Sequence, residues 1–174
     1  MQEIRGEIAD SIKSFKLPEY EAIPNVGLYL EQVTKYIADY LEPLESIAIT
    51  SSMIGNYVKK HLIDNPVKKQ YYREQIAYLI FIAVAKSALS LEDIQLLIDI
   101  KHKTYDSKTA YEYFCKEFEN VLHYVFGLKE RPDAIGRGNN DAKILLRNTI
   151  MTVAHKIYLD KYFARYTEVM KEEQ

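Results

Sequence analysis

Residues that could do chemistry concentrate between Thr50 and Arg73, in the segment TSSMIGNYVKKHLIDNPVKKQYYR. Five basic residues stand there against one acid, a charge of +4, whereas the whole chain carries −2 and the remainder therefore −6. Cations gathered in one segment of an otherwise acidic chain form a local surface that can attract a polyanion. The chemistry predicted is non-covalent recognition of a nucleic acid, by hydrogen bonds to base edges and ion pairs to phosphates.

The first half of this segment has the pattern of an amphipathic helix. A hydroxyl group at Thr50 or Ser51 can accept a hydrogen bond from an N–H group of the first turn, which starts the helix there. Apolar residues recur at helical spacing on the inward face, while polar and basic residues at spacings of three and four form an outward ridge. Asparagine, serine and lysine suit contacts with base edges and phosphates in a major groove. The ridge consists of Ser52, Asn56, Lys59 and Lys60.

The second half of the segment predicts a basic loop. Asp64, Asn65 and Pro66 end the helix, and the Lys68–Lys69 pair follows on a short turn. Two cations there can lie along a phosphate backbone. The residues that we expect to contact DNA are Ser51, Ser52, Asn56, Tyr57, Lys59, Lys60, Lys68, Lys69, Tyr71 and Arg73. A core helix whose lysines are merely solvated is the alternative interpretation of the same pattern.

The remaining sequence predicts the helices that must position this segment. The chain has 174 residues, 48% of them hydrophobic, with only 6 Gly and 5 Pro, which favours a mainly α-helical protein of one domain or two small ones. An amphipathic arm is expected over 2–16, and a proline-marked connector over 18–24. Asn25 can cap a helix that ends near Leu41.

Later segments predict the core. Glu74–Ser87 is too apolar for a surface helix and is placed at the centre, and Ser90 with Asp93 forms a capping-box-like start for the next helix. A core helix is expected from Thr109 to Phe126. The last helix carries an apolar seam that is typical of a dimerising helix. The seam consists of Leu146, Ile150, Val153, Ile157 and Tyr162.

Other classes of function find no local support in the sequence. The longest apolar run, Ala77 to Ala85, has nine residues, whereas a membrane-spanning helix needs about 20. The four histidines form no metal-binding motif, and no GxSxG or Cys–His signature occurs, so we expect no enzyme, no metal and no cofactor. The single cysteine, Cys115, is expected to pack in the core and suits a reducing cytoplasm.

Two resemblances to known families sharpen these expectations. The order Thr50-Ser51-Ser52-Met53-Ile54, Asn56-Tyr57, Leu62-Ile63, Pro66, Tyr71 or Tyr72, a long apolar helix and then Ser90-Leu91-Glu92-Asp93-Ile94 resembles the DNA-binding domain of MerR-type regulators, over roughly residues 26–103. Nearly the whole chain, with Pro24 to Gly27, resembles a family of uncharacterised bacterial proteins of unknown function predicted to carry such a domain.

The resemblance implies a helix-turn-helix followed by a wing and two helices. A recognition helix over about 50–62 would then enter the major groove, and a basic wing over 64–72 would contact phosphates. The chain divides into an arm and connector over 1–25, the helix-turn-helix domain over 26–103, and a helical region over 104–174 that dimerises or senses an effector.

Three functions remain open at this point. The preferred one is a cytoplasmic bacterial transcription regulator. It would bind double-stranded DNA as a homodimer, and an unidentified small-molecule or protein effector would regulate it. The alternative is a non-enzymatic helical protein-interaction module on a winged-helix scaffold. The third is a small-molecule-binding domain in residues 103–174, which would require a closed apolar pocket with a few convergent polar groups.

Overall fold

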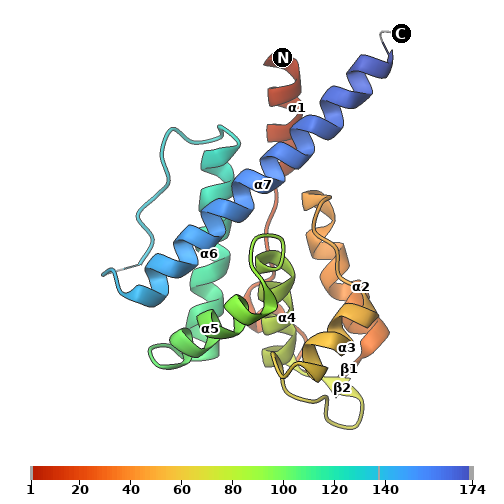
Figure 1. The fold of residues 1–174 in the computed structure, drawn as a ribbon, viewed down its shortest axis with the longest axis vertical. Helices are drawn as coiled ribbons and strands as arrows, with labels where there is room; N and C mark the ends of the chain where they lie inside the picture. The colour runs from red at the N-terminus through yellow and green to blue at the C-terminus, as the bar shows by residue number, and fades with distance from the viewer. Residues whose placement is uncertain (1, 137, 173–174) are drawn as a thin grey trace.

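The computed structural model describes residues 2–136 and 138–172. This part of the chain is mostly helical, with seven α-helices and one two-stranded sheet, which confirms the predicted all-α class with minor β structure (Figure 1). The elements in order are α1 (Gln2–Ile12), η1 (Tyr20–Ala22), β1 (Leu28–Tyr29), α2 (Leu30–Leu41), η2 (Glu42–Leu44), α3 (Ser51–Lys59), β2 (Gln70–Tyr71), α4 (Arg73–Ala85), α5 (Leu91–His102), α6 (Ser107–Val125) and α7 (Asp141–Glu172).

Helix α4 lies at the centre of the fold, as its composition predicts. Eight of its 13 residues are buried, and it packs against α2, α6 and α7. Apolar side chains from the other six α-helices of the described residues join it in one continuous core. The thiol of Cys115 belongs to that core, and burial raises its pKa to about 12, so the prediction of a core cysteine is confirmed.

The N-terminal arm is fixed by its apolar stripe. Ile4, Ile8, Ile12 and Phe15 are buried, and the Phe15 ring meets the Phe118 ring edge-on at 5.9 Å between centroids. Helix α1 lies beside the second half of α7, and the first residues of α1 and the last residues of α7 lie at the same end of the molecule (Figure 1). The predicted stripe is confirmed, although the helix ends at Ile12.

The connector after α1 is tied to α6 by two long-range hydrogen bonds. The Tyr111 hydroxyl donates to the carbonyl oxygen of Pro18 at 3.0 Å. The backbone N–H of Leu17 donates to Glu119 Oε1 at 3.1 Å. The backbone of this connector belongs to no helix or strand, so side chains of α6 satisfy its Pro18 carbonyl and its Leu17 N–H group.

The prediction that Asn25 caps the helix ending at Leu41 is wrong. Residues 28–29 form β1, and α2 begins only at Leu30, where the backbone N–H of Tyr29 donates to Gln32 Oε1 at 2.9 Å. Pairing with β2 requires extended backbone before the helix, which local sequence does not reveal. The predicted end of this helix at Leu41 is confirmed.

The predicted seam on α7 is not available to a partner. Ile150, Val153 and Ile157 are at most 1% exposed because they face the chain's own core, where α7 packs against α1, α4, α5 and α6. The apolar positions are needed inside the monomer, so their assignment to a dimer interface is wrong.

None of the described helices has both the length and the apolar character needed to cross a membrane.

A buried lysine joins α7 to the connection between α2 and α3. The side chain of Lys161 is 2% exposed, and its Nζ atom lies 2.5 Å from Glu45 Oε1. Glu45 itself holds a positive φ of 60° directly after η2. An ammonium group removed from water needs a compensating charge. The ion pair therefore fixes the connection that positions α3.

We predict that Glu45→Ala destabilises the protein by about 1 to 2 kcal/mol, because it removes the carboxylate that compensates the buried Lys161 ammonium, while the 62% exposure of Glu45 lets solvent screen part of the loss. The double substitution Glu45→Ala/Lys161→Met should cost less than Glu45→Ala alone, since no buried charge remains. Urea unfolding followed by circular dichroism measures both free energies of unfolding. A double variant less stable than the single variant would contradict this account of the pair.

Candidate nucleic-acid interface

Helix α3 begins where the sequence predicts. The Thr50 side chain accepts a hydrogen bond from the N–H of Met53 at 3.2 Å, so Thr50 is the N-cap. Ile54 and Tyr57 are buried and anchor the helix to the core. Helix α3 packs against α2 on this inward side.

The opposite side of α3 is open to solvent. Ser52, Asn56 and Lys59 are exposed, one helical turn apart, as the predicted ridge requires. These side chains carry a hydroxyl, an amide and an amine, which can hydrogen-bond with base edges or phosphates. The fourth ridge residue, Lys60, is the C-cap of α3 and is also exposed, so the structure leaves all four predicted ridge residues uncovered.

The helix ends earlier than the predicted residue 62. It stops at Lys59, because His61 adopts a φ of 59° and reverses the chain. The N–H of Leu62 then donates to the carbonyl oxygen of Tyr57 at 3.0 Å, the pattern of a Schellman C-cap. Leu62 turns inward and is buried, so it belongs to the cap and the core.

A tight hairpin over residues 67–70 follows α3 in the position of the predicted basic loop. Its second side, β2, also pairs antiparallel with β1, the strand that precedes α2, with Leu28 opposite Tyr71 and Tyr29 opposite Gln70. Val67 and Gln70 exchange two backbone hydrogen bonds of 2.9 and 3.0 Å around the tip. Gly27 permits this packing, since a Cβ atom there would lie 2.6 Å from Gln70 Oε1. The hairpin and α3 lie at the same end of the molecule (Figure 1).

The hairpin tip is formed by Lys68 and Lys69 in an unusual conformation. Their φ angles are 49° and 66°, the left-handed region that a type I′ turn requires at both central positions. Asn-Gly is the common pair there, because glycine has no Cβ atom and the short polar side chain of asparagine tolerates the left-handed region, whereas a long side chain such as lysine is strained. Both lysines are exposed. The chain thus keeps two amines where turn geometry favours other residues, a feature that often marks function.

Four of the ten predicted contact residues point elsewhere. Tyr57 and Tyr71 are buried, and burial raises the pKa of both hydroxyl groups. Ser51 Oγ lies 3.1 Å from both Glu31 Oε1 and Thr34 Oγ1, within the contact between α2 and α3. We leave these three out of the proposed interface because core packing or a neighbouring helix already occupies them.

Arg73, the fourth, holds the N-terminal connector. Its Nη1 atom lies 2.5 Å from Glu21 Oε2, its Nε donates to the Ile23 carbonyl at 2.9 Å, and its guanidinium stands 5.8 Å from the centre of the Tyr20 ring. Glu21 also pairs with Lys108 of α6 at 2.7 Å. Hydrogen bonds and charges from Lys108 and Arg73 lower the pKa of Glu21. Arg73 therefore links α4 to η1.

The remaining lysines differ in their surroundings. Lys60 Nζ lies 3.7 Å from Glu92 Oε1, with both side chains largely in solvent. Glu92, at the start of α5, therefore places a carboxylate at the border of the basic surface, by which we mean the surface formed by Lys59, Lys60, Lys68 and Lys69. The ion pairs of the described residues do not include Lys59, Lys68 or Lys69. These three amines, together with the largely exposed Lys60, are the cations that this surface offers to an anion.

Sequence reasoning missed three exposed apolar residues around the hairpin. Val26, Tyr29 and Val67 are 70%, 55% and 58% exposed. Strands of two residues are too short to show the alternating pattern that would have revealed which side chains face solvent. Within the described part of the chain, no group of three or more His, Cys, Asp or Glu residues is placed to hold a metal ion.

Fold and surface together define a mainly helical protein with a small antiparallel hairpin whose tip is basic. A family model described as "Domain of unknown function (DUF1836)" matches residues 18–114, more than half of the chain, from the connector to the first half of α6. The chain belongs to this family. Neither the curated proteins nor the solved structures contain a match to it.

We predict that the double substitution Lys68→Asn/Lys69→Gly stabilises the protein by about 2 kcal/mol. It removes the conformational strain of two lysines in the left-handed region, which is about 1 kcal/mol for each. His61→Gly should stabilise by about 1 kcal/mol for the same reason. Thermal and urea unfolding measure both changes. Unchanged or lower stability in the hairpin variant would show that the lysines are not strained in this turn.

Proposed function

We propose that this protein is a DNA-binding transcriptional regulator with a MerR-like winged helix-turn-helix. In this proposal α3 lies in the major groove of double-stranded DNA, and the Lys68–Lys69 tip contacts phosphates as the wing. The observation that carries the proposal is the strained lysine pair at the hairpin tip, at the same end of the molecule as the exposed ridge of α3. The contact residues are now Ser52, Asn56, Lys59, Lys60, Lys68 and Lys69.

The order of elements supports a division of labour along the chain. Helices α2 and α3 are in contact and would form the helix-turn-helix, the hairpin follows, and α4 and α5 complete a unit over residues 26–103. Residues 1–25 then act as an arm that braces this unit. Residues 104–174, with α6 and α7, form the part that dimerises or senses an effector.

A non-enzymatic protein-interaction module is the second candidate, and two observations favour it. Glu92 borders the basic surface through its 3.7 Å contact with Lys60, and a duplex would repel that carboxylate. Val26, Tyr29 and Val67 are exposed together around the hairpin, as residues of a protein-binding surface often are. A protein partner would then use the hairpin and leave the α3 ridge in solvent.

We predict salt-dependent binding of full-length protein to a duplex chosen by random-site selection. Lys59→Ala should weaken binding to all sequences and reduce the slope of log affinity against log salt by about 1, because one phosphate contact is lost. Asn56→Ala should instead relax sequence preference, because asparagine reads base edges. Fluorescence anisotropy at several salt concentrations measures both effects.

The hairpin variant distinguishes an effect on DNA binding from an effect on the stability of the fold, because the two are expected to change in opposite directions. Lys68→Asn/Lys69→Gly should weaken DNA binding and reduce the salt slope by about 2, although the fold becomes more stable. His61→Gly relieves similar strain without removing a cation, so it serves as the matched control with unchanged affinity. If the wild-type protein binds no duplex at low salt, the DNA proposal fails. The protein-interaction candidate then stands.

The proposed regulator is a homodimer, and the second half of α7 supplies its interface. Leu159, Phe163, Tyr166 and Met170 are 49%, 60%, 42% and 41% exposed and follow one another at steps of four, three and four residues. That spacing places them on one side of the helix, as in a coiled-coil seam that pairs with its own copy. This end of α7 projects from the body of the molecule beside α1 (Figure 1).

We predict that Phe163→Glu converts the dimer to a monomer, because it places a carboxylate in the centre of this apolar stripe. Leu96→Glu on α5 is the matched control, since Leu96 is 59% exposed and lies outside the stripe. Sedimentation velocity across a range of concentrations measures the oligomeric state. A monomeric wild-type protein, or a Phe163→Glu variant that still dimerises, would contradict this interface.

A further inference from the structure

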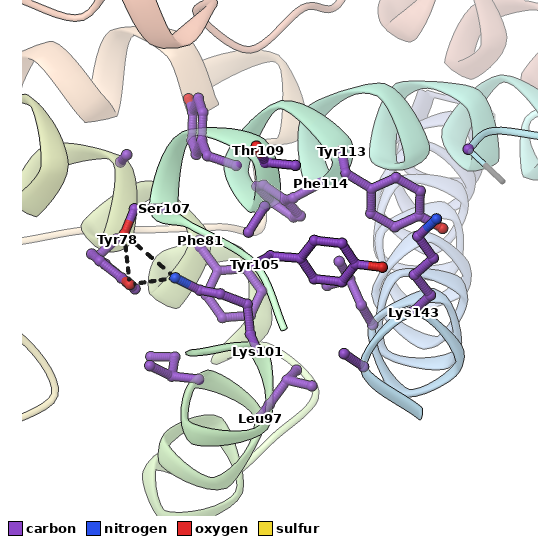
Figure 2. A pocket seen from close by; sticks show the side chains of 17 residues that line it. Tyr78, Phe81, Leu97, Lys101, Tyr105, Ser107, Thr109, Tyr113, Phe114 and Lys143 are labelled. Carbon is purple, nitrogen blue, oxygen red and sulfur yellow. Dashed lines mark hydrogen bonds between the residues drawn. The ribbon is translucent and has the colours of Figure 1, made fainter. Parts of the chain in front are cut away.

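A cavity of about 250 Å³ lies between α4, α5, α6 and α7. It is distinct from the basic surface, because none of the proposed DNA-contacting residues lines it. Figure 2 shows its wall, with side chains from all four helices pointing toward a common space. Part of the cavity is open to solvent, so a small molecule can enter without unfolding a helix.

Most of the wall is apolar. Each of the four helices contributes apolar side chains to it, among them Phe81 of α4, Leu97 of α5, Phe114 of α6 and Leu146 of α7. The rings of Phe81 and Phe114 meet edge-on at 5.2 Å between centroids, so they form a rigid corner. Apolar cavities with a few polar groups are the usual form of small-molecule sites. The body of a ligand here must be apolar.

Lys101 places an amine at one side of this cavity. Its Nζ atom donates to the Tyr78 hydroxyl at 2.6 Å and to Ser107 Oγ at 3.4 Å, and it stands 4.9 Å from the centre of the Tyr78 ring (Figure 2). Ser107 in turn donates to Glu74, and Tyr78 also contacts His102 at 3.1 Å. An ammonium group has three donors, and these contacts use two of them. The side chain is therefore fixed in place with one donor left for a ligand.

A second amine faces the same cavity from α7. Lys143 is 8% exposed, and its Nζ atom stands 5.2 Å from the Tyr113 ring centre and 5.9 Å from that of Tyr105. Two lysines thus line the cavity, whereas its lining contains no aspartate and no glutamate among the described residues. Both hydrogen bonds of Lys101 go to neutral hydroxyl groups, so an anion placed beside its ammonium would gain a charge-assisted hydrogen bond that a neutral molecule or a cation would not.

We propose that this cavity binds a small monocarboxylic acid with an apolar body. Its carboxylate would accept a hydrogen bond from Lys101, and its hydrocarbon part would fill the space between Phe81, Phe114 and Leu146. At about 30 Å³ per atom, the volume of a water molecule in the liquid, the cavity holds roughly eight non-hydrogen atoms. The eight carbon atoms of octanoate match that number, and its two carboxylate oxygens would lie beside the half-buried Lys101, at the edge of the cavity. This proposal does not depend on DNA binding.

Calorimetric titration of the full-length protein with octanoate, octan-1-ol, octylamine and acetate tests the proposal. Octanoate should bind at least about tenfold more tightly than octan-1-ol, because only the carboxylate gains a charge-assisted hydrogen bond. Octylamine should bind more weakly still, and acetate should show no binding because it lacks the apolar body. Octanoate should also raise the Tm of the protein, since it binds the folded state alone.

Three variants locate the site. Lys101→Met should weaken octanoate binding about tenfold and leave octan-1-ol binding unchanged. Lys103→Met is the matched control, because Lys103 is exposed and does not line the cavity. Ala110→Leu should abolish binding of both compounds, since the larger side chain fills the space. Circular dichroism and urea unfolding verify that each variant folds.

Several outcomes would overturn the proposal. Octan-1-ol or octylamine binding as tightly as octanoate would remove the case for an anion. Equal losses in Lys101→Met and Lys103→Met, or no loss in either, would place the carboxylate elsewhere. Octanoate that gives neither binding heat nor a rise in Tm at millimolar concentration would show that the cavity does not take this class of ligand.

Discussion

Burial of α4 on nearly all sides is the constraint on which the rest of the structure depends. Its apolar residues cannot be exposed without losing the burial energy that stabilises the fold, so α2, α6 and α7 must all pack around it. The hairpin leads directly into its first turn, where Arg73 ties it to the N-terminal connector. One buried helix thereby sets the positions of both the basic surface and the apolar cavity.

The basic surface remains exposed because the core takes only the opposite side of each element. In α3, Ile54 and Tyr57 face inward, which leaves Ser52, Asn56 and Lys59 outside. In the hairpin, Tyr71 is buried and anchors the strand, while the two tip lysines project beyond the last paired residues. A substitution at these exposed positions can therefore change recognition with little change in packing.

The cavity has a different origin, since four helices meet there without closing the space between them. Tyrosine hydroxyl groups and lysine amines replace part of the aliphatic packing found elsewhere in the core. Polar groups in such a position need hydrogen-bond partners, and Tyr78, Lys101 and Ser107 supply one another. The network fixes the amine of Lys101 at the cavity wall, which a flexible surface lysine would not achieve.

Local signals in the sequence determined several elements of this protein. Thr50 and Ser90 cap their helices as predicted, because an N-cap depends on residues three positions apart. The stripe of α1, the central place of α4 and the buried Cys115 follow from hydrophobic periodicity, which reports burial without reference to a partner. These features depend on neighbours in the chain.

Tertiary structure alone decided where side chains with two possible partners go. The sequence predicts Arg73 as a DNA-contacting cation, but Glu21, 52 residues away in the chain, pairs with it. The spacing of the α7 seam suits a dimer, but α4 and α6 of the same chain cover it. The strand at residues 28–29 and the cavity at Lys101 likewise depend on segments distant in sequence. Periodicity shows that a side chain is buried or charged, but only the assembled fold shows what it contacts.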